Sequence, residues 1–80
     1  MNETEALDWI AEVFEEPPGR LRADMPSSEI AGWDSLGMLS LIAALDEKFN
    51  IQLDETEIYG IKGVRDVLAL LERAGVLVMA

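Results

Sequence analysis

The chain has 80 residues, half of them hydrophobic but only 6% aromatic, and its formal net charge is -10. This length allows a single domain over residues 1–80 with a modest core, and the composition favours helices over strands. Nucleic acid is a poor partner for so acidic a chain, because phosphate binding requires clustered Lys and Arg. Basic protein surfaces are the complement that the charge favours.

The chain contains no cysteine and no histidine. The lack of cysteine excludes disulfides and thiolate metal sites, and it suits a reducing compartment. The N-terminal segment is acidic where a secretory signal would be basic and then apolar, and no apolar run approaches the roughly 18 residues of a membrane span. We therefore expect a cytoplasmic monomer with no membrane span and no metal site.

The first predicted helix covers residues 3–15 and ends before Pro17. Its apolar residues have the spacing of an amphipathic helix, and Asn2 with Glu5 has the spacing of a capping box. Residues 15–34 form a long connection, and connections of this length inside a compact domain are usually functional. Four of its apolar residues are expected to pin it onto the core: Leu21, Met25, Ile30 and Trp33.

The other helices are predicted at residues 35–49, 55–60 and 64–74. Asp34 is the expected N-cap of the second helix, and Asn50 ends it because Asn tolerates a left-handed conformation. Asp54 and Glu57 have capping-box spacing before the short third helix. The last helix begins after Gly63, a weak cap, so its first turn is expected to fray. The fold class is all-α, with the C-terminal VLVMA either packed or frayed.

The second helix carries apolar residues on two opposite arcs when it is projected at about 100° per residue. One arc is assigned to the core: Met38, Leu41, Ile42, Leu45 and Phe49. The opposite arc consists of Leu36, Leu39 and Ala43, and we call it the docking arc. A bundle of this size cannot cover both sides of the helix, so the docking arc is expected to contact a partner. The alternative is that residues 15–34 fold over Leu36 and Leu39.

Ser35 opens the second helix, within the stretch GWDSLGMLSL. One interpretation is that Asp34 or Ser35 merely caps the helix. A catalytic serine is disfavoured, because its hydroxyl would need a neighbouring base and the only alternatives to histidine, Lys48 and Lys62, are expected to be solvated. We therefore expect no enzyme but a serine that another enzyme modifies, at a helix N-terminus that favours an attached phosphate.

With these features the chain resembles an acyl carrier protein of the bacterial stand-alone type. The likeness covers most of the chain and is most specific in GWDSLGMLSLIAALDEKFNIQL and IKGVRDVLALL. It implies an antiparallel four-helix bundle in which Ser35 receives 4'-phosphopantetheine from coenzyme A through a separate Mg-dependent transferase. The thiol of that arm would carry acyl groups as thioesters. Asp34 and Leu36 match the residues that flank the modified serine in the family.

The resemblance also implies where partners and cargo would bind. The docking arc matches positions that face partner enzymes, which would be loading ligases or synthases with basic docking surfaces. Glu47, Glu55 and Glu57 would add negative charge to this face. The space between the second and third helices would accept a short acyl chain, with plain packing as an equal alternative. The residues proposed to line it are Leu45, Phe49, Ile58 and Ile61.

The chain departs from the family on the face that follows the serine. Gly37, Ser40 and Lys48 stand where carriers of fatty acid synthesis usually have acids. The weaker negative charge indicates a specialised carrier, in fatty acid, lipid or polyketide-type biosynthesis, that serves a dedicated ligase or synthase. Gly37 also carries a cost of roughly 1 kcal/mol in a helix interior relative to Ala, softened by its place in the first turn.

Two other functions remain open, and a third is excluded. An aminoacyl or peptidyl carrier would use the same serine and the same arm. An unmodified acidic adaptor would dock through the same arc without any need for Ser35. A calcium site in DEKFNIQLDETE is excluded, because Lys48 and Ile51 occupy positions where an EF-hand loop needs Asp or Asn and Gly.

Overall fold

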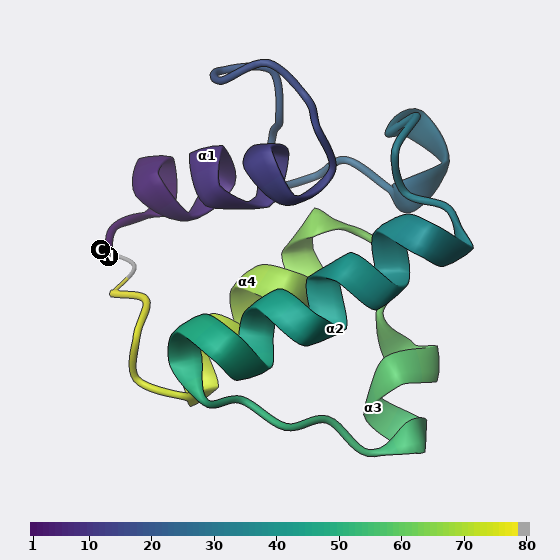
Figure 1. Ribbon diagram of the computed structural model, residues 1–80. Coiled ribbons are helices and arrows are strands. Elements are labelled where there is room, and N and C mark those ends of the chain that lie inside the picture. Colours follow the sequence, from purple (N-terminus) through teal and green to yellow (C-terminus); the bar gives the residue numbers. More distant parts are fainter. Residues whose placement is uncertain (79–80) are drawn as a thin grey trace.

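A computed structural model describes residues 1–78 of the chain, and within them it contains no named strand (Figure 1). In Figure 1, α1 runs antiparallel to α2, α4 lies behind α2, and α3 lies across one end of the bundle. The all-α prediction, with a short third helix and a long first connection, is confirmed. The elements are α1 (Glu3–Val13), the 3-10 turn η1 (Ser27–Glu29), α2 (Ser35–Phe49), α3 (Glu55–Gly60) and α4 (Val64–Arg73).

The core is formed by the facing sides of α1, α2 and α4. Aromatic rings close its edges: Trp9 meets Phe49 edge-on at 5.0 Å between centroids, and Phe14 stacks on Trp33 at 4.4 Å. No polar or charged side chain is buried among the described residues. The largest fully buried side chains are Ile10, Leu41, Leu45, Val64, Val67 and Leu71.

The predicted caps of α1, α2 and α3 are present. Asn2 and Asp54 each accept a hydrogen bond from the third residue of their helix, and the glutamates at those positions complete both capping boxes. Asn50 follows α2 with a φ of 55°, in the left-handed conformation that was predicted. These three helix boundaries depend only on residues within one turn of the chain, which is why sequence alone predicts them.

The first helix ends two residues earlier than predicted, at Val13, and the cause is Glu15. Glu15 has a φ of 59°, its N–H donates to the carbonyl of Glu12, and the N–H of Glu16 donates to the carbonyl of Ala11. This pair of bonds is a Schellman motif, in which the left-handed position usually holds Gly. The prolines that follow were predicted to stop the helix, but the chain has already turned at Glu15.

The long connection packs against the core as predicted, through Leu21, Met25 and Ile30, which are buried. It does not cover the docking arc: 75% of Leu36 and 63% of Leu39 are exposed. The alternative in which residues 15–34 fold over this face is therefore wrong. Instead the segment contacts the other side of the bundle, where Pro26 and Gly63 form an isolated antiparallel bridge.

That bridge also explains the glycine before α4. The N–H of Val64 donates to the carbonyl of Met25 at 3.0 Å, and the N–H of Ser27 donates to the carbonyl of Lys62 at 2.9 Å. A Cβ on Gly63 would lie 2.9 Å from the carbonyl oxygen of Met25, so a Ser or Thr cap does not fit there without a shift. The prediction that this first turn frays did not include these two hydrogen bonds from the long connection, which hold the start of α4.

The two ends of the described chain are joined. The N-terminal ammonium of Met1 donates to the carbonyl of Val76 at 3.0 Å, and the N–H of Val78 donates to the carbonyl of Met1 at 2.9 Å. Leu77 between them is buried. The C-terminal VLVMA is thus a packed end as far as Val78, and its last two residues lie outside the described part.

Candidate functional site

Ser35 is the first residue of α2 and is exposed. The N-cap is the preceding residue, because the carboxylate of Asp34 accepts a hydrogen bond from the N–H of Gly37 at 2.8 Å. Within residues 1–78 the Ser35 hydroxyl makes no hydrogen bond to another side chain or to the backbone as a cap. Capping therefore explains Asp34 and leaves the hydroxyl of Ser35 available to solvent.

No neighbouring group prepares this hydroxyl as a nucleophile. Lys48 lies thirteen residues further along the same helix, roughly 20 Å away at 1.5 Å per residue, and its ammonium sits 5.9 Å from the ring centroid of Phe49. Lys62 precedes α4 and is exposed. Nor do three or more His, Cys, Asp and Glu residues gather as a metal site anywhere in the described chain. Neither lysine forms a hydrogen bond with Ser35 in the described residues, so a base that activates the hydroxyl is not built in by these lysines.

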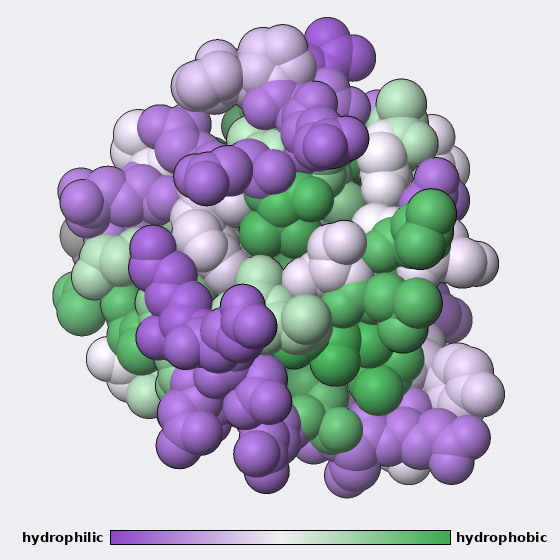
Figure 2. Space-filling model, viewed as in Figure 1, coloured by the Kyte–Doolittle hydropathy of each residue, from purple (hydrophilic) through white to green (hydrophobic). Residues whose placement is uncertain are grey.

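The docking arc lies beside Ser35 on the outer side of α2. Leu36, Leu39 and Ala43 are exposed, and Figure 2 shows hydrophobic surface over α2, bordered by hydrophilic residues. Tyr59 of α3 is also exposed, at 71%. Large apolar side chains that project into solvent at one place on a small domain are typical of a protein contact.

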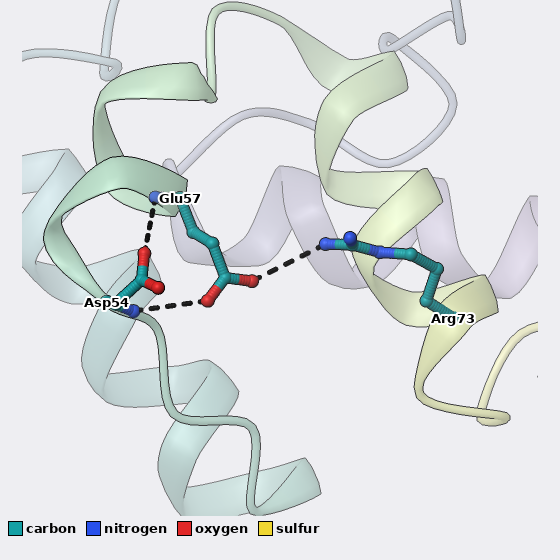
Figure 3. A network of polar contacts seen from close by, with 3 residues as sticks. All are labelled: Asp54, Glu57 and Arg73. Carbon is teal, nitrogen blue, oxygen red and sulfur yellow. Dashed lines mark hydrogen bonds and ion pairs between the residues drawn. The ribbon is translucent and has the colours of Figure 1, made fainter.

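The acidic residues expected on this face differ in how free their carboxylates are to contact a partner. Glu47 and Glu55 are exposed, and Glu55 accepts only a long hydrogen bond of 3.5 Å from the hydroxyl of Tyr59. Glu57 is engaged inside the molecule, because its carboxylate closes the capping box of α3 and also pairs with Arg73 of α4 at 3.5 Å (Figure 3). The charge of Glu57 is thus partly neutralised, and its geometry fits a link between α3 and α4.

The proposed acyl-pocket residues differ in how deeply they are buried, although Leu45 and Ile61 belong to the hydrophobic core and Phe49 packs against it. Leu45 is fully buried in the core, and Phe49 packs against Trp9 of α1. Ile61 is buried, and its edge lines a surface pocket of about 270 Å³ at the junction of α3 and α4, together with Gly60 and Leu70. Ile58 is half-buried. Packing alone accounts for Leu45 and Phe49 here.

Gly37 has a structural role that the sequence did not reveal. A Cβ at this position would overlap the carbonyl oxygen of Gly32 and crowd the ring of Phe14. The first turn of α2 therefore lies directly against the end of the long connection, and no side chain fits between them. Packing therefore excludes an acidic side chain at this position.

A cleft next to Ser35 was not predicted from the sequence. Its volume is about 350 Å³, and it is lined by residues from the end of α1 and from the first two turns of α2. No sequence pattern indicates it, since its two walls are separated by the long connection. Six of its lining residues are Val13, Phe14, Glu15, Asp34, Leu36 and Ser40.

In the described part of the chain no helix is long and apolar enough to cross a membrane. The features so far define a class: a small acidic helical domain that offers a serine hydroxyl at a helix start, beside an apolar face. This is the design of a covalent carrier domain. It fits an attached phosphodiester, since the first N–H groups of α2 and the helix dipole favour negative charge there.

Comparison with known proteins gives the same class. Residues 6–71 match the family model for the phosphopantetheine attachment site. The acyl carrier protein of Campylobacter hominis is 31% identical over 68 residues, which cover 85% of this chain and 86% of that protein. The acyl carrier protein of Wolinella succinogenes is 36% identical over 70 residues, covering 82% and 92%. The acyl carrier protein of Bdellovibrio bacteriovorus is 29% identical over 68 residues, covering 85% and 87%. No solved structure matches the chain.

The chain belongs to the acyl carrier protein family. Proteins of this family carry a covalently attached 4'-phosphopantetheine and act as carriers, not as catalysts. Their partners include a phosphopantetheinyl transferase and acyl-handling enzymes. The cofactor and non-enzyme predictions are confirmed at this level, and the position of attachment and the pathway are taken up next.

Proposed function

We propose that this protein carries acyl intermediates as thioesters on a 4'-phosphopantetheine arm attached to Ser35. The observation that supports this most is the division of labour at the start of α2. Asp34 alone provides the cap, at 2.8 Å from the N–H of Gly37, while the hydroxyl beside it is exposed and has no structural task. A hydroxyl held at a helix start without a structural use suits a modification site.

In the attachment step Ser35 is the nucleophile, and no base of this chain takes part. The oxygen of Ser35 forms a bond to the pantetheine-bearing phosphorus of coenzyme A, the phosphoanhydride bond breaks, and adenosine 3',5'-bisphosphate leaves. The hydroxyl proton passes to a base of the transferase, because the Ser35 hydroxyl makes no hydrogen bond to a base within residues 1–78. Once attached, the group supplies a thiol that binds acyl groups as thioesters.

We further propose a specialised carrier with a dedicated ligase or synthase in fatty acid, lipid or polyketide-type biosynthesis. Support comes from α2, which has no acid in its first turn and exposes Leu36 and Leu39. A docking face with more apolar contact and less charge selects partners by shape. The net charge of -10 favours a monomer through mutual repulsion, and a cysteine-free chain suits the cytoplasm.

Intact-mass spectrometry tests the attachment. The protein is incubated with coenzyme A, Mg²⁺ and a broad-specificity phosphopantetheinyl transferase, and the expected product carries one phosphopantetheine. Ser35→Ala should abolish the addition, whereas Ser40→Ala, a matched exposed serine on the same helix, should not. A wild-type mass that stays unchanged, or an addition that survives Ser35→Ala, would refute the assignment.

An aminoacyl or peptidyl carrier is the second candidate, because the weak charge of α2 fits it equally. Thioester loading of the modified protein with acyl ligases and with adenylating enzymes for amino acids separates the two. An unmodified adaptor is the third candidate, since the docking arc needs no arm to bind a partner. In that case Ser35→Ala would leave the function of the protein intact in cells.

A further inference from the structure

The end of α1 and the start of α2 meet in a tight contact around Phe14. The ring of Phe14 is buried and stacks on Trp33, at 4.4 Å between centroids and 16° between planes. A Cβ built on Gly37 would lie 3.1 Å from a ring carbon of Phe14, and one built on Gly32 would overlap the carbonyl oxygen of Phe14. Phe14 therefore lies against both the end of the long connection and the first turn of α2.

Trp33 joins this contact to the serine. It directly precedes the N-cap Asp34, and Ser35 follows as the first residue of α2. The backbone N–H of Trp33 donates to the carbonyl of Ile30 at 3.1 Å, and Ile30 is buried. Both the backbone and the ring of Trp33 are thus held, the ring by an aromatic stack on a residue of the core. The place of Ser35 is therefore tied to α1 through one pair of rings.

A second aromatic pair offers a direct comparison. Trp9 of α1 meets Phe49 edge-on at 5.0 Å between centroids. Phe49 is the last residue of α2, fourteen residues after Ser35 and roughly 20 Å from it at 1.5 Å per residue. Trp9 and Trp33 are both half-buried and both pack against the core. The two pairs thus hold opposite ends of α2, and only the Phe14–Trp33 stack is close to the hydroxyl.

We propose that Trp33 is a positioning residue for the attachment of phosphopantetheine, because its stack on Phe14 fixes the place at which Ser35 is presented to the transferase. The Ser35 hydroxyl is not the cap of α2, so the backbone sets its position. A nucleophile that is held in place avoids an entropic cost in each reaction. A displaced one loses rate more than affinity, since the docking arc on the same helix still binds the enzyme. The proposal rests on the proposed function, because it requires transfer to Ser35.

Steady-state kinetics of phosphopantetheine transfer test the proposal, with this protein as the varied substrate of a broad-specificity transferase. Trp33→Leu keeps apolar bulk without a ring, Trp33→Phe keeps a ring, and Trp9→Leu is the matched control at the other end of α2. For Trp33→Leu we expect a kcat roughly tenfold below that of Trp9→Leu, with KM values within about threefold of each other. Trp33→Phe should retain most of the wild-type kcat, because its ring still stacks on Phe14.

Hydrogen exchange of backbone amides gives a second measurement, which needs no transferase. The N–H of Gly37 donates to the carboxylate of Asp34, so its exchange reports on how firmly the first turn of α2 is held. We expect it to exchange about threefold faster or more in Trp33→Leu than in Trp9→Leu. Phe14→Leu removes the other ring of the stack and should match Trp33→Leu in both measurements. Urea unfolding shows which variants are folded, and either of these two carries the test alone.

Two results would overturn the proposal. One is a kcat within about twofold of the Trp9→Leu control for the folded variants that lack the stack. The other is a Trp33→Phe protein that is as slow as Trp33→Leu, since a ring at this position must preserve the rate if the stack positions Ser35. A wild-type protein that accepts no phosphopantetheine refutes the assignment of Ser35 instead. In that case the exchange of the Gly37 N–H still shows whether the stack holds the start of α2.

Discussion

The carboxylate of Asp34 accepts a hydrogen bond of 2.8 Å from the backbone N–H of Gly37. This bond caps α2, whose first residue is Ser35. We predict that Asp34→Ala lowers the free energy of unfolding by about 1 kcal/mol, because one orphan N–H of the first turn loses its acceptor. Asp34→Asn should keep most of this stability, since Asn caps equally well. Urea unfolding measures both, and equal losses for the two variants would contradict the assignment of the cap.

Gly37 is predicted to resist replacement by the best helix former. Gly37→Ala should destabilise the protein by about 1 to 3 kcal/mol, because the added Cβ overlaps the carbonyl oxygen of Gly32. On propensity alone the same change would stabilise a helix. Gly60→Ala is the control, since a Cβ at Gly60 meets nothing within 4 Å. Thermal unfolding that shows Gly37→Ala as stable as Gly60→Ala would disprove the contact.

The docking arc is predicted to be dispensable for folding. Leu39→Asp should change the free energy of unfolding by less than about 0.5 kcal/mol, because the side chain is 63% exposed. It should, however, impair transfer to and from partner enzymes. Leu41→Asp, two residues further along and fully buried, should prevent cooperative unfolding altogether. A large loss of stability in Leu39→Asp would mean that this face is packed.

Glu15 is predicted to lower the stability of the protein through its left-handed conformation. Glu15→Gly should raise the free energy of unfolding by up to about 1 kcal/mol, because Gly adopts the left-handed conformation without steric cost. Urea unfolding of the two proteins measures the difference. A Glu15→Gly protein that is no more stable than the wild type would contradict a left-handed strain at this position.

The sequence predicted those parts of the fold that are determined over a few residues. The residues predicted to begin or end helices occupy the expected positions, since caps act within one turn. They are Asn2 with Glu5, Asp34, Asn50, and Asp54 with Glu57. The exposure of Leu36 and Leu39 also follows from a simple count of how much surface a small bundle can cover. In these places local chemistry and global packing agree.

The features that the sequence missed arise from contacts across the chain. Three features depend on how the long connection packs against the helices. They are the contact of Gly37 with Gly32, the bridge between Pro26 and Gly63, and the cleft lined by Glu15. No periodicity in a single segment reports such contacts.

The pairing of Met1 with residues 76–78 has a practical consequence for handling the protein. In Figure 1 the N-terminus lies at the opposite end of α2 from Ser35. A circular permutant could join the first residue to the 76–78 region and place the new ends in the exposed Pro17–Arg20 turn. Such a permutant would keep every helix. Fluorophores or fused domains attached near Met1 should likewise remain remote from an enzyme working on the serine.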